Sequence, residues 1–83
     1  MEIEFLEKFS RDLDRLVDVS TKIAVRKAIT SIQQAHSLNE ISNIKKLRGY
    51  KTAFRIRIGD YRIGLFVEGD VVQFARIVHR KDI

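Results

Sequence analysis

Apolar residues in the first half of the chain recur mostly at the spacing of a helix. Residues 2–5 alternate between polar and apolar, which predicts a short opening strand. Apolar side chains then fall on one side of a first helix, at Phe5, Leu6, Phe9, Leu13, Leu16 and Val17. A second apolar stripe predicts another helix, at Ala24, Val25, Ala28, Ile29, Ile32 and Ala35. Ser20 and Thr21 can cap this helix, which should end near residues 36–39. Two consecutive helices predict a helical hairpin.

After residue 50 the apolar period changes to two, which is typical of strands. We expect strands at 54–58, 61–67 and 71–79, joined by turns at 59–60 and 68–70. A short N-terminal strand, a helical hairpin and a three-stranded antiparallel meander in one sheet define an α+β fold. The helices should cover one face of the sheet and leave the other free. A chain of 83 residues without a linker predicts a single domain over residues 1–83.

The first hairpin predicts that two arginines face each other. A two-residue loop at Gly59-Asp60 places Ile58 opposite Tyr61 and Arg57 opposite Arg62. Like charges directly across a strand pair are unfavourable, so this pair indicates an anionic ligand that neutralises it. The alternative is that both guanidinium groups turn into water.

The loop of the second hairpin decides where the remaining arginines lie. A three-residue loop at 68–70 pairs Val67 with Val71 and places Arg76 opposite Arg62, whereas a two-residue loop puts Arg76 on the apolar face, where an unpaired charge is costly. We therefore expect a single outer face around Gly64, Phe66 and Phe74 that holds Arg57, Arg62, Arg76 and Arg80. On the other face, the helices should dock through Phe9, Leu13, Leu16, Val25, Ile29 and Ile32 onto Ile56, Ile63, Leu65 and Ile77.

The charge is concentrated in the second half of the chain. The 16 Lys and Arg exceed the 11 Asp and Glu by five, and residues 44–83 alone hold ten bases and four acids. This field suits a polyanion such as RNA or DNA, or an acidic protein, although a basic surface that serves only solubility is the alternative. The chain has no cysteine, no P-loop, no Ser/His/Asp pattern and no apolar run that could span a membrane, and its acidic N-terminus predicts that it has no signal peptide.

Three short blocks in the second half carry a resemblance to a known family. They are Lys46-Leu47-Arg48-Gly49, the stretch Phe54-Arg55-Ile56-Arg57-Ile58-Gly59-Asp60-Tyr61-Arg62-Ile63, and Ile77-Val78-His79-Arg80-Lys81-Asp82. In their order and spacing behind a helical hairpin, the chain resembles the RelE/ParE toxin superfamily over essentially its whole length. That family has the same strand, helix pair and antiparallel sheet.

The resemblance implies a toxin of a type II toxin-antitoxin system that cleaves messenger RNA in the ribosomal A site, without a metal or another cofactor. It implies catalytic roles for Arg57, Arg62 and Arg80, with a second set of bases in contact with the RNA, namely Arg55, Arg76, Lys46, Arg48 and Lys51. RelE-type nucleases commonly place a tyrosine that acts as general base beyond the last arginine, but no tyrosine follows Arg80 here. His79 is a substitute candidate, although its alternation phase places it away from the arginines, and Tyr61 falls on the core side.

Two other functions stay open within the same family. The ParE branch inhibits DNA gyrase and does not use this basic set, and a non-catalytic module would use the basic face only to bind its antitoxin. The partners implied are a cognate antitoxin protein, the ribosome and messenger RNA, with no membrane and a cytoplasmic location.

Overall fold

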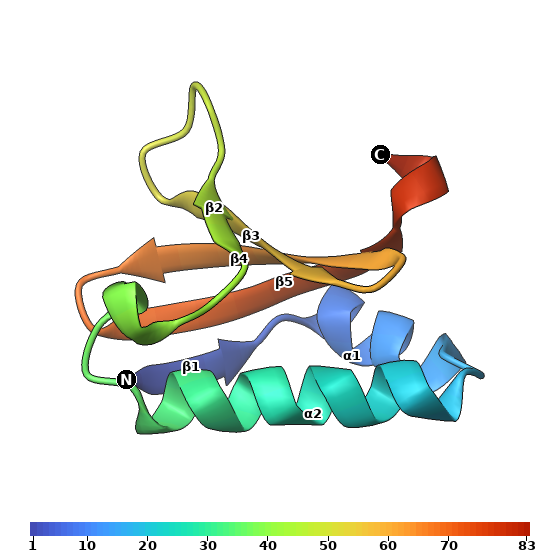
Figure 1. The fold of residues 1–83 in the computed structure, drawn as a ribbon. Coiled ribbons are helices and arrows are strands. Elements are labelled where there is room, and N and C mark those ends of the chain that lie inside the picture. Colours follow the sequence, from blue (N-terminus) through green and yellow to red (C-terminus); the bar gives the residue numbers. More distant parts are fainter.

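The computed structural model describes residues 1–83 and places two helices against a five-stranded sheet (Figure 1). The elements follow in the order β1 (Glu2–Phe5), α1 (Glu7–Arg15), α2 (Val19–Gln34), η1 (Leu38–Glu40), β2 (Ile44–Lys46), β3 (Ala53–Ile58), β4 (Tyr61–Glu68), β5 (Val71–His79) and η2 (Arg80–Asp82). The strands lie in the order β1-β5-β4-β3-β2, and only β1 runs parallel to its neighbour. The α+β prediction is confirmed, while β2 was not predicted because three residues are too few to show alternation. Neither helix is long and apolar enough to cross a membrane.

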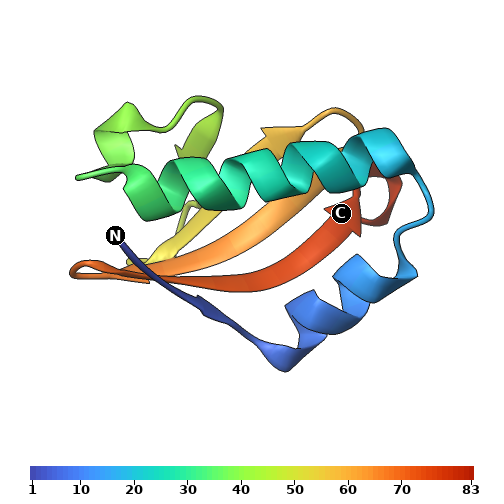
Figure 2. The same cartoon turned by 90° about the horizontal axis from the view of Figure 1, so that it is seen from below.

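Both helices lie on one face of the sheet (Figure 2). Between them and the sheet lies a core of ten buried side chains: Phe9, Leu16, Val25, Ile32, Ile56, Ile63, Leu65, Val72, Phe74 and Ile77. Leu13 and Ile29 pack against this core, so the predicted docking of the helices onto the sheet is confirmed. The opposite face, which we call the outer face, is left uncovered by the helices.

The boundaries of both helices differ from the prediction. Val17 does not join the stripe of α1, because the helix ends at Arg15 and leaves Val17 89% exposed. The cap of α2 is Asp18, whose carboxylate accepts hydrogen bonds from the Ser20 N–H and from the hydroxyls of Ser20 and Thr21. The Ser20 and Thr21 hydroxyls thus support the cap and lower the pKa of Asp18.

The prediction for the second hairpin was wrong in its register. Glu68 pairs with Val71 across a two-residue turn in which Gly69 has a φ of 59°, a conformation that favours glycine. Phe74 is therefore fully buried on the helix side and is absent from the outer face.

A β-bulge in β5 explains how Arg76 still avoids the core. The register shifts between Gly64 and Leu65, where Leu65 pairs with Phe74 and Gly64 pairs with Arg76, which leaves Ala75 as the extra residue. The alternation of β5 is reset at that point, so Ile77 returns to the core while Arg76 remains exposed. As a consequence Arg62 lies opposite Val78, and the expected pairing of Arg62 with Arg76 does not form.

Candidate functional site

Four cationic side chains meet on the outer face where β2, β3 and β4 lie side by side. Arg57 lies directly opposite Arg62, as predicted, and Lys45 lies directly opposite Arg55. The four residues, which we call the cation cluster, line an open hollow of about 360 Å³ together with Asn43 and Ile44. Residues paired directly across neighbouring strands project to the same face, so the register alone brings these charges together.

No carboxylate neutralises the cation cluster. The side-chain ion pairs of the molecule join Glu7 to Arg11, Asp12 to Arg76 and Asp60 to Arg80, and no acidic residue lines the hollow. Repulsion among four unpaired cations opposes folding, and an anion bound in the hollow would relieve it.

Backbone carbonyls hold the side chain of Arg62 in place. Its Nη1 donates to the carbonyl oxygens of Gly59 and Tyr61, each at 2.9 Å. The Gly59 carbonyl belongs to the β3–β4 turn, and the Tyr61 carbonyl belongs to the first residue of β4. The turn therefore positions the guanidinium. Arg57 is exposed, while Arg55 and Arg62 are half-buried.

Arg76 lies outside the hollow and is already paired. Its Nε donates to the Asp12 carboxylate at 2.7 Å, which raises the pKa of Arg76. With its charge compensated by α1, Arg76 is the least available of the predicted RNA-binding residues.

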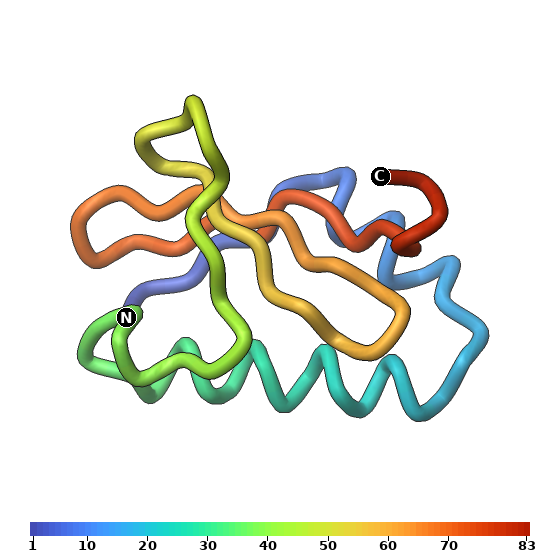
Figure 3. Tube along the Cα trace, turned by 45° about the horizontal axis from the view of Figure 1, so that its top comes forward, coloured from blue at the N-terminus to red at the C-terminus, as the bar shows by residue number.

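The remaining predicted residues occupy two other places. The Arg80 guanidinium lies 3.5 Å from the Asp60 carboxylate, and the backbone N–H of Arg80 donates to the Asp60 carbonyl, which fixes η2 beside the β3–β4 turn. Lys46, Arg48 and Lys51 line the hollow of a loop over residues 46–51 that projects from the β2–β3 end of the molecule (Figure 3). Of the predicted set, therefore, the cation cluster unites only Arg55, Arg57 and Arg62.

His79 and Tyr61 lie on the helix side, as their alternation predicted. They are paired across β4 and β5, and their rings meet edge to face with centroids 5.0 Å apart. The Lys81 N–H donates to His79 Nδ1, so neutral His79 carries its proton on Nε2. Neither ring lines the hollow of the cation cluster.

Lys45 is the site residue that the sequence analysis missed. It precedes the Lys46-Leu47-Arg48-Gly49 block and lies on β2, the strand that the alternation did not reveal. The apolar–polar step from Ile44 to Lys45 was the only available signal. Among the four cations it is the only amine, whereas the other three are guanidinium groups, which remain charged in proteins.

The arrangement is suited to binding a phosphodiester. Arginine guanidinium groups bind phosphate oxygens in a bidentate manner, and two strands present three of them at one open surface. No group of three or more His, Cys, Asp or Glu side chains that could hold a metal ion is present.

Comparison with known families and proteins gives two sequence matches. Residues 3–83 match the family model described as the ParE toxin of the type II toxin-antitoxin system parDE. The chain is also 39% identical over 84 residues to Toxin RelE3 of Methanocaldococcus jannaschii, covering 100% of this chain and 94% of that protein.

Solved structures match over nearly the whole chain. A RelB-RelE antitoxin-toxin complex from Methanococcus jannaschii contains a chain with a TM-score of 0.84 and 37% identity, covering 94% of this chain and 91% of that one. The RelE-RelB complex from the archaeon Pyrococcus horikoshii matches with a TM-score of 0.75 at 17% identity, covering 99% of this chain and 97% of that one. The RelBE2 complex from Mycobacterium tuberculosis matches with a TM-score of 0.72 at 24% sequence identity, covering 95% of this chain and 96% of that one. At these lower identities, the P. horikoshii and M. tuberculosis matches show a shared fold.

Proposed function

Because the chain belongs to the RelE/ParE superfamily of type II toxin-antitoxin toxins, we propose that it cleaves messenger RNA on the ribosome. The observation that carries this proposal is the cation cluster, in which Lys45, Arg55, Arg57 and Arg62 share one open hollow without a carboxylate. A scissile phosphate would supply the missing negative charge.

The proposed reaction is attack by a ribose 2′-hydroxyl on the adjacent phosphorus. The bond from phosphorus to the 5′-oxygen breaks, which leaves a cyclic phosphate on one product and a 5′-hydroxyl on the other. The pentavalent intermediate carries more negative charge than the substrate, so preorganised guanidinium groups stabilise it preferentially. Arg62 is the best held of these groups, because two carbonyls fix its position.

Lys45 supplies the proton for the leaving 5′-oxygen in this proposal. Guanidinium groups are poor proton donors, whereas an ammonium group can act as a general acid. The proton of the attacking hydroxyl passes to solvent or to a ribosomal group. Lys45→Arg keeps the positive charge, so a loss of cleavage in this variant separates proton transfer from electrostatic stabilisation.

The Arg62→Ala variant tests the proposal. We expect cleavage to fall on the order of 10² to 10³-fold, the typical effect of removing one preorganised donor, in a primer-extension assay on translating ribosomes. Arg26→Ala is the matched control, because Arg26 is exposed on α2, on the helix side of the sheet. Wild-type protein that cleaves no message would refute the nuclease, and Arg62→Ala that cleaves normally would refute the role of Arg62.

The match to a family model described as a ParE toxin favours a second candidate function, the inhibition of DNA gyrase. A gyrase supercoiling assay run on the same preparations separates the two. Gyrase inhibition without message cleavage would replace the nuclease with this alternative.

We further propose that a cognate antitoxin neutralises the toxin by covering the cation cluster. The M. jannaschii relative at 37% identity was solved with its RelB antitoxin, and four unpaired cations suit an acidic or amphipathic segment. In a structure of the complex we expect a carboxylate from the partner within the hollow. A partner seated only on the helical side would contradict direct occlusion.

A further inference from the structure

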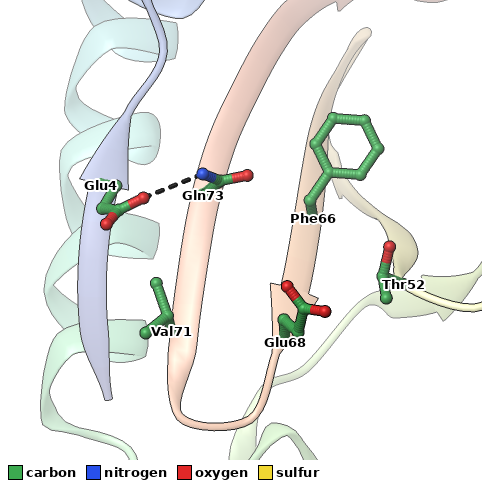
Figure 4. A pocket seen from close by; sticks show the side chains of 6 residues that line it. All are labelled: Glu4, Thr52, Phe66, Glu68, Val71 and Gln73. Carbon is green, nitrogen blue, oxygen red and sulfur yellow. Dashed lines mark hydrogen bonds between the residues drawn. The ribbon is translucent and has the colours of Figure 1, made fainter.

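A second hollow lies on the outer face, toward the β4–β5 turn (Figure 4). It shares no lining residue with the hollow of the cation cluster. It has a volume of about 370 Å³, and we call it the Phe66 hollow. Six side chains from β1, β4, β5 and the residue before β3 line it: Glu4, Thr52, Phe66, Glu68, Val71 and Gln73. Alternation along the strand predicted Phe66 on this face but indicated no function for it.

The Phe66 hollow and the cation cluster lie along the same strand. Arg62, Gly64, Phe66 and Glu68 alternate in β4 with Ile63 and Leu65, which are buried on the helix side. Arg62 and Phe66 are four residues apart, which is about 13 Å along a strand. An extended polymer bound at Arg62 could therefore reach Phe66 along one surface.

Gly64 leaves the sheet bare between these two places. Its partners across the sheet are Arg55 on β3 and Arg76 on β5. A Cβ at this position would approach nothing closer than 4.0 Å, so neither packing nor backbone conformation within the protein demands a glycine. Glycine within a strand often marks a place where a ligand approaches closely.

Phe66 provides a stacking surface within the hollow. Phe66 is 42% exposed, although phenylalanine is among the residues most often buried. Nucleobases stack on exposed aromatic rings of this kind.

The polar groups around Phe66 are mainly hydrogen-bond acceptors. Gln73 donates through Nε2 to Glu4 Oε1 at 2.9 Å, which turns its amide oxygen toward the side of Phe66 (Figure 4). Glu68 adds a carboxylate, and Thr52 adds a hydroxyl. Two carboxylates disfavour a phosphate here, whereas they accept hydrogen bonds from amino groups.

We propose that the Phe66 hollow is a nucleobase subsite that selects bases bearing an exocyclic amino group over uracil. The inference rests on the proposed RNA substrate. The base stacks on Phe66 and donates from its amino group to Glu68 and to the amide oxygen of Gln73, while the cation cluster holds a phosphate of the same strand. Uracil has carbonyl oxygens where the other bases carry amino groups, so it places acceptor against acceptor.

Binding of short single strands tests the subsite without requiring cleavage. The probes are oligouridines labelled at one end. One has only uridines, and the others carry a single adenosine or a single cytidine at the centre. All have 2′-O-methyl groups, so that they cannot be cut. We expect tighter binding of the strands that contain adenosine or cytidine, and a loss of about five- to a hundredfold for every strand with Phe66→Ala. Glu68→Gln should reduce the preference over uridine to less than about twofold.

Two variants control for fold and charge. Ile23→Ala removes an exposed apolar side chain from α2, and Asp14→Asn removes one exposed carboxylate from α1. Both should bind the strands like wild type. Urea denaturation of each variant verifies that it is folded.

The outcomes separate this inference from the proposed nuclease. A base preference that depends on Phe66 and Glu68 supports the subsite, even where the protein cleaves no message on ribosomes. Equal binding of all strands, unchanged by Phe66→Ala, overturns it. Variants that lose affinity for a cognate antitoxin while binding RNA normally also overturn it and assign the surface to that partner.

Discussion

Asp12 joins α1 to the edge of β5 through one carboxylate. β1 ends at Phe5, opposite Phe74, so beyond that point the edge of β5 that faces away from β4 has no neighbouring strand. Asp12 takes its place by accepting hydrogen bonds from Arg76 Nε at 2.7 Å and from the Ile77 N–H at 2.9 Å. Desolvation disfavours the charged carboxylate, but these bonds and the charges of Arg76 and Arg15 outweigh it and hold the pKa of Asp12 below its ordinary 3.8.

We expect Asp12→Ala to lower the free energy of unfolding by about 1–3 kcal/mol near neutral pH, because the part-buried Ile77 N–H loses its acceptor. The folded pKa is depressed, so the stabilisation by the charged form is present above pH 3.8 and is lost as the pH falls through the folded pKa. Urea denaturation across that range measures both effects. A difference between wild type and variant that grows on acidification would contradict the assignment.

At the scale of elements, the docking of α1 depends on where the helix ends. Leu16, its C-cap, is only 8% exposed and belongs to the core, whereas the next residue, Val17, is almost fully exposed. Helical periodicity assigned both to one stripe, but the backbone leaves the helix at Leu16, with a ψ of 127°, and turns Val17 toward water. Leu16 and Val17 are adjacent and both apolar, but only Leu16 contributes to the packing of the core.

Leu16→Ala and Val17→Ala form a matched pair for this packing. We expect Leu16→Ala to cost about 2–5 kcal/mol through lost burial and the cavity that remains. Val17→Ala should change stability by less than about 0.5 kcal/mol. Chemical denaturation of the two variants measures the contrast, and a near-neutral Leu16→Ala would show that α1 does not dock as described.

On the scale of the whole molecule, the outer face is electrically divided. The cation cluster occupies the part near the β3–β4 turn, and the Phe66 hollow, with Glu4 and Glu68, occupies the part near the β4–β5 turn. The basic loop over residues 46–51 adds charge at the β2–β3 end. The net charge of +5 is thus less informative than its placement, because cations and carboxylates occupy separate parts of one surface.

Salt dependence measures how many phosphates this surface binds. Each neutralised phosphate of a single strand contributes about −0.7 to the slope of log affinity against log salt, so a slope of roughly −3 is expected if the scissile phosphate and its neighbours together neutralise all four cations. Arg57→Ala should make the slope shallower by about 0.7, while Arg26→Ala should leave it unchanged. Identical slopes for wild type and Arg57→Ala would place the bound strand elsewhere.

Local rules were sufficient for much of this molecule. Alternation identified β3, β4 and β5, the helical period identified α2 and most of α1, and the tight Gly59-Asp60 turn placed Arg57 opposite Arg62. These features depend on neighbours a few residues apart, which a sequence pattern records directly.

The tertiary structure decided the features that depend on distant partners. A sequence pattern cannot reveal an extra residue at Ala75, because the bulge resolves a conflict between a favoured two-residue turn and the exclusion of Arg76 from the core. It cannot show that Asp12, 64 residues earlier, neutralises Arg76. Nor can it place Lys45 among the arginines, because the three-residue β2 is defined by its pairing with β3 rather than by its own alternation.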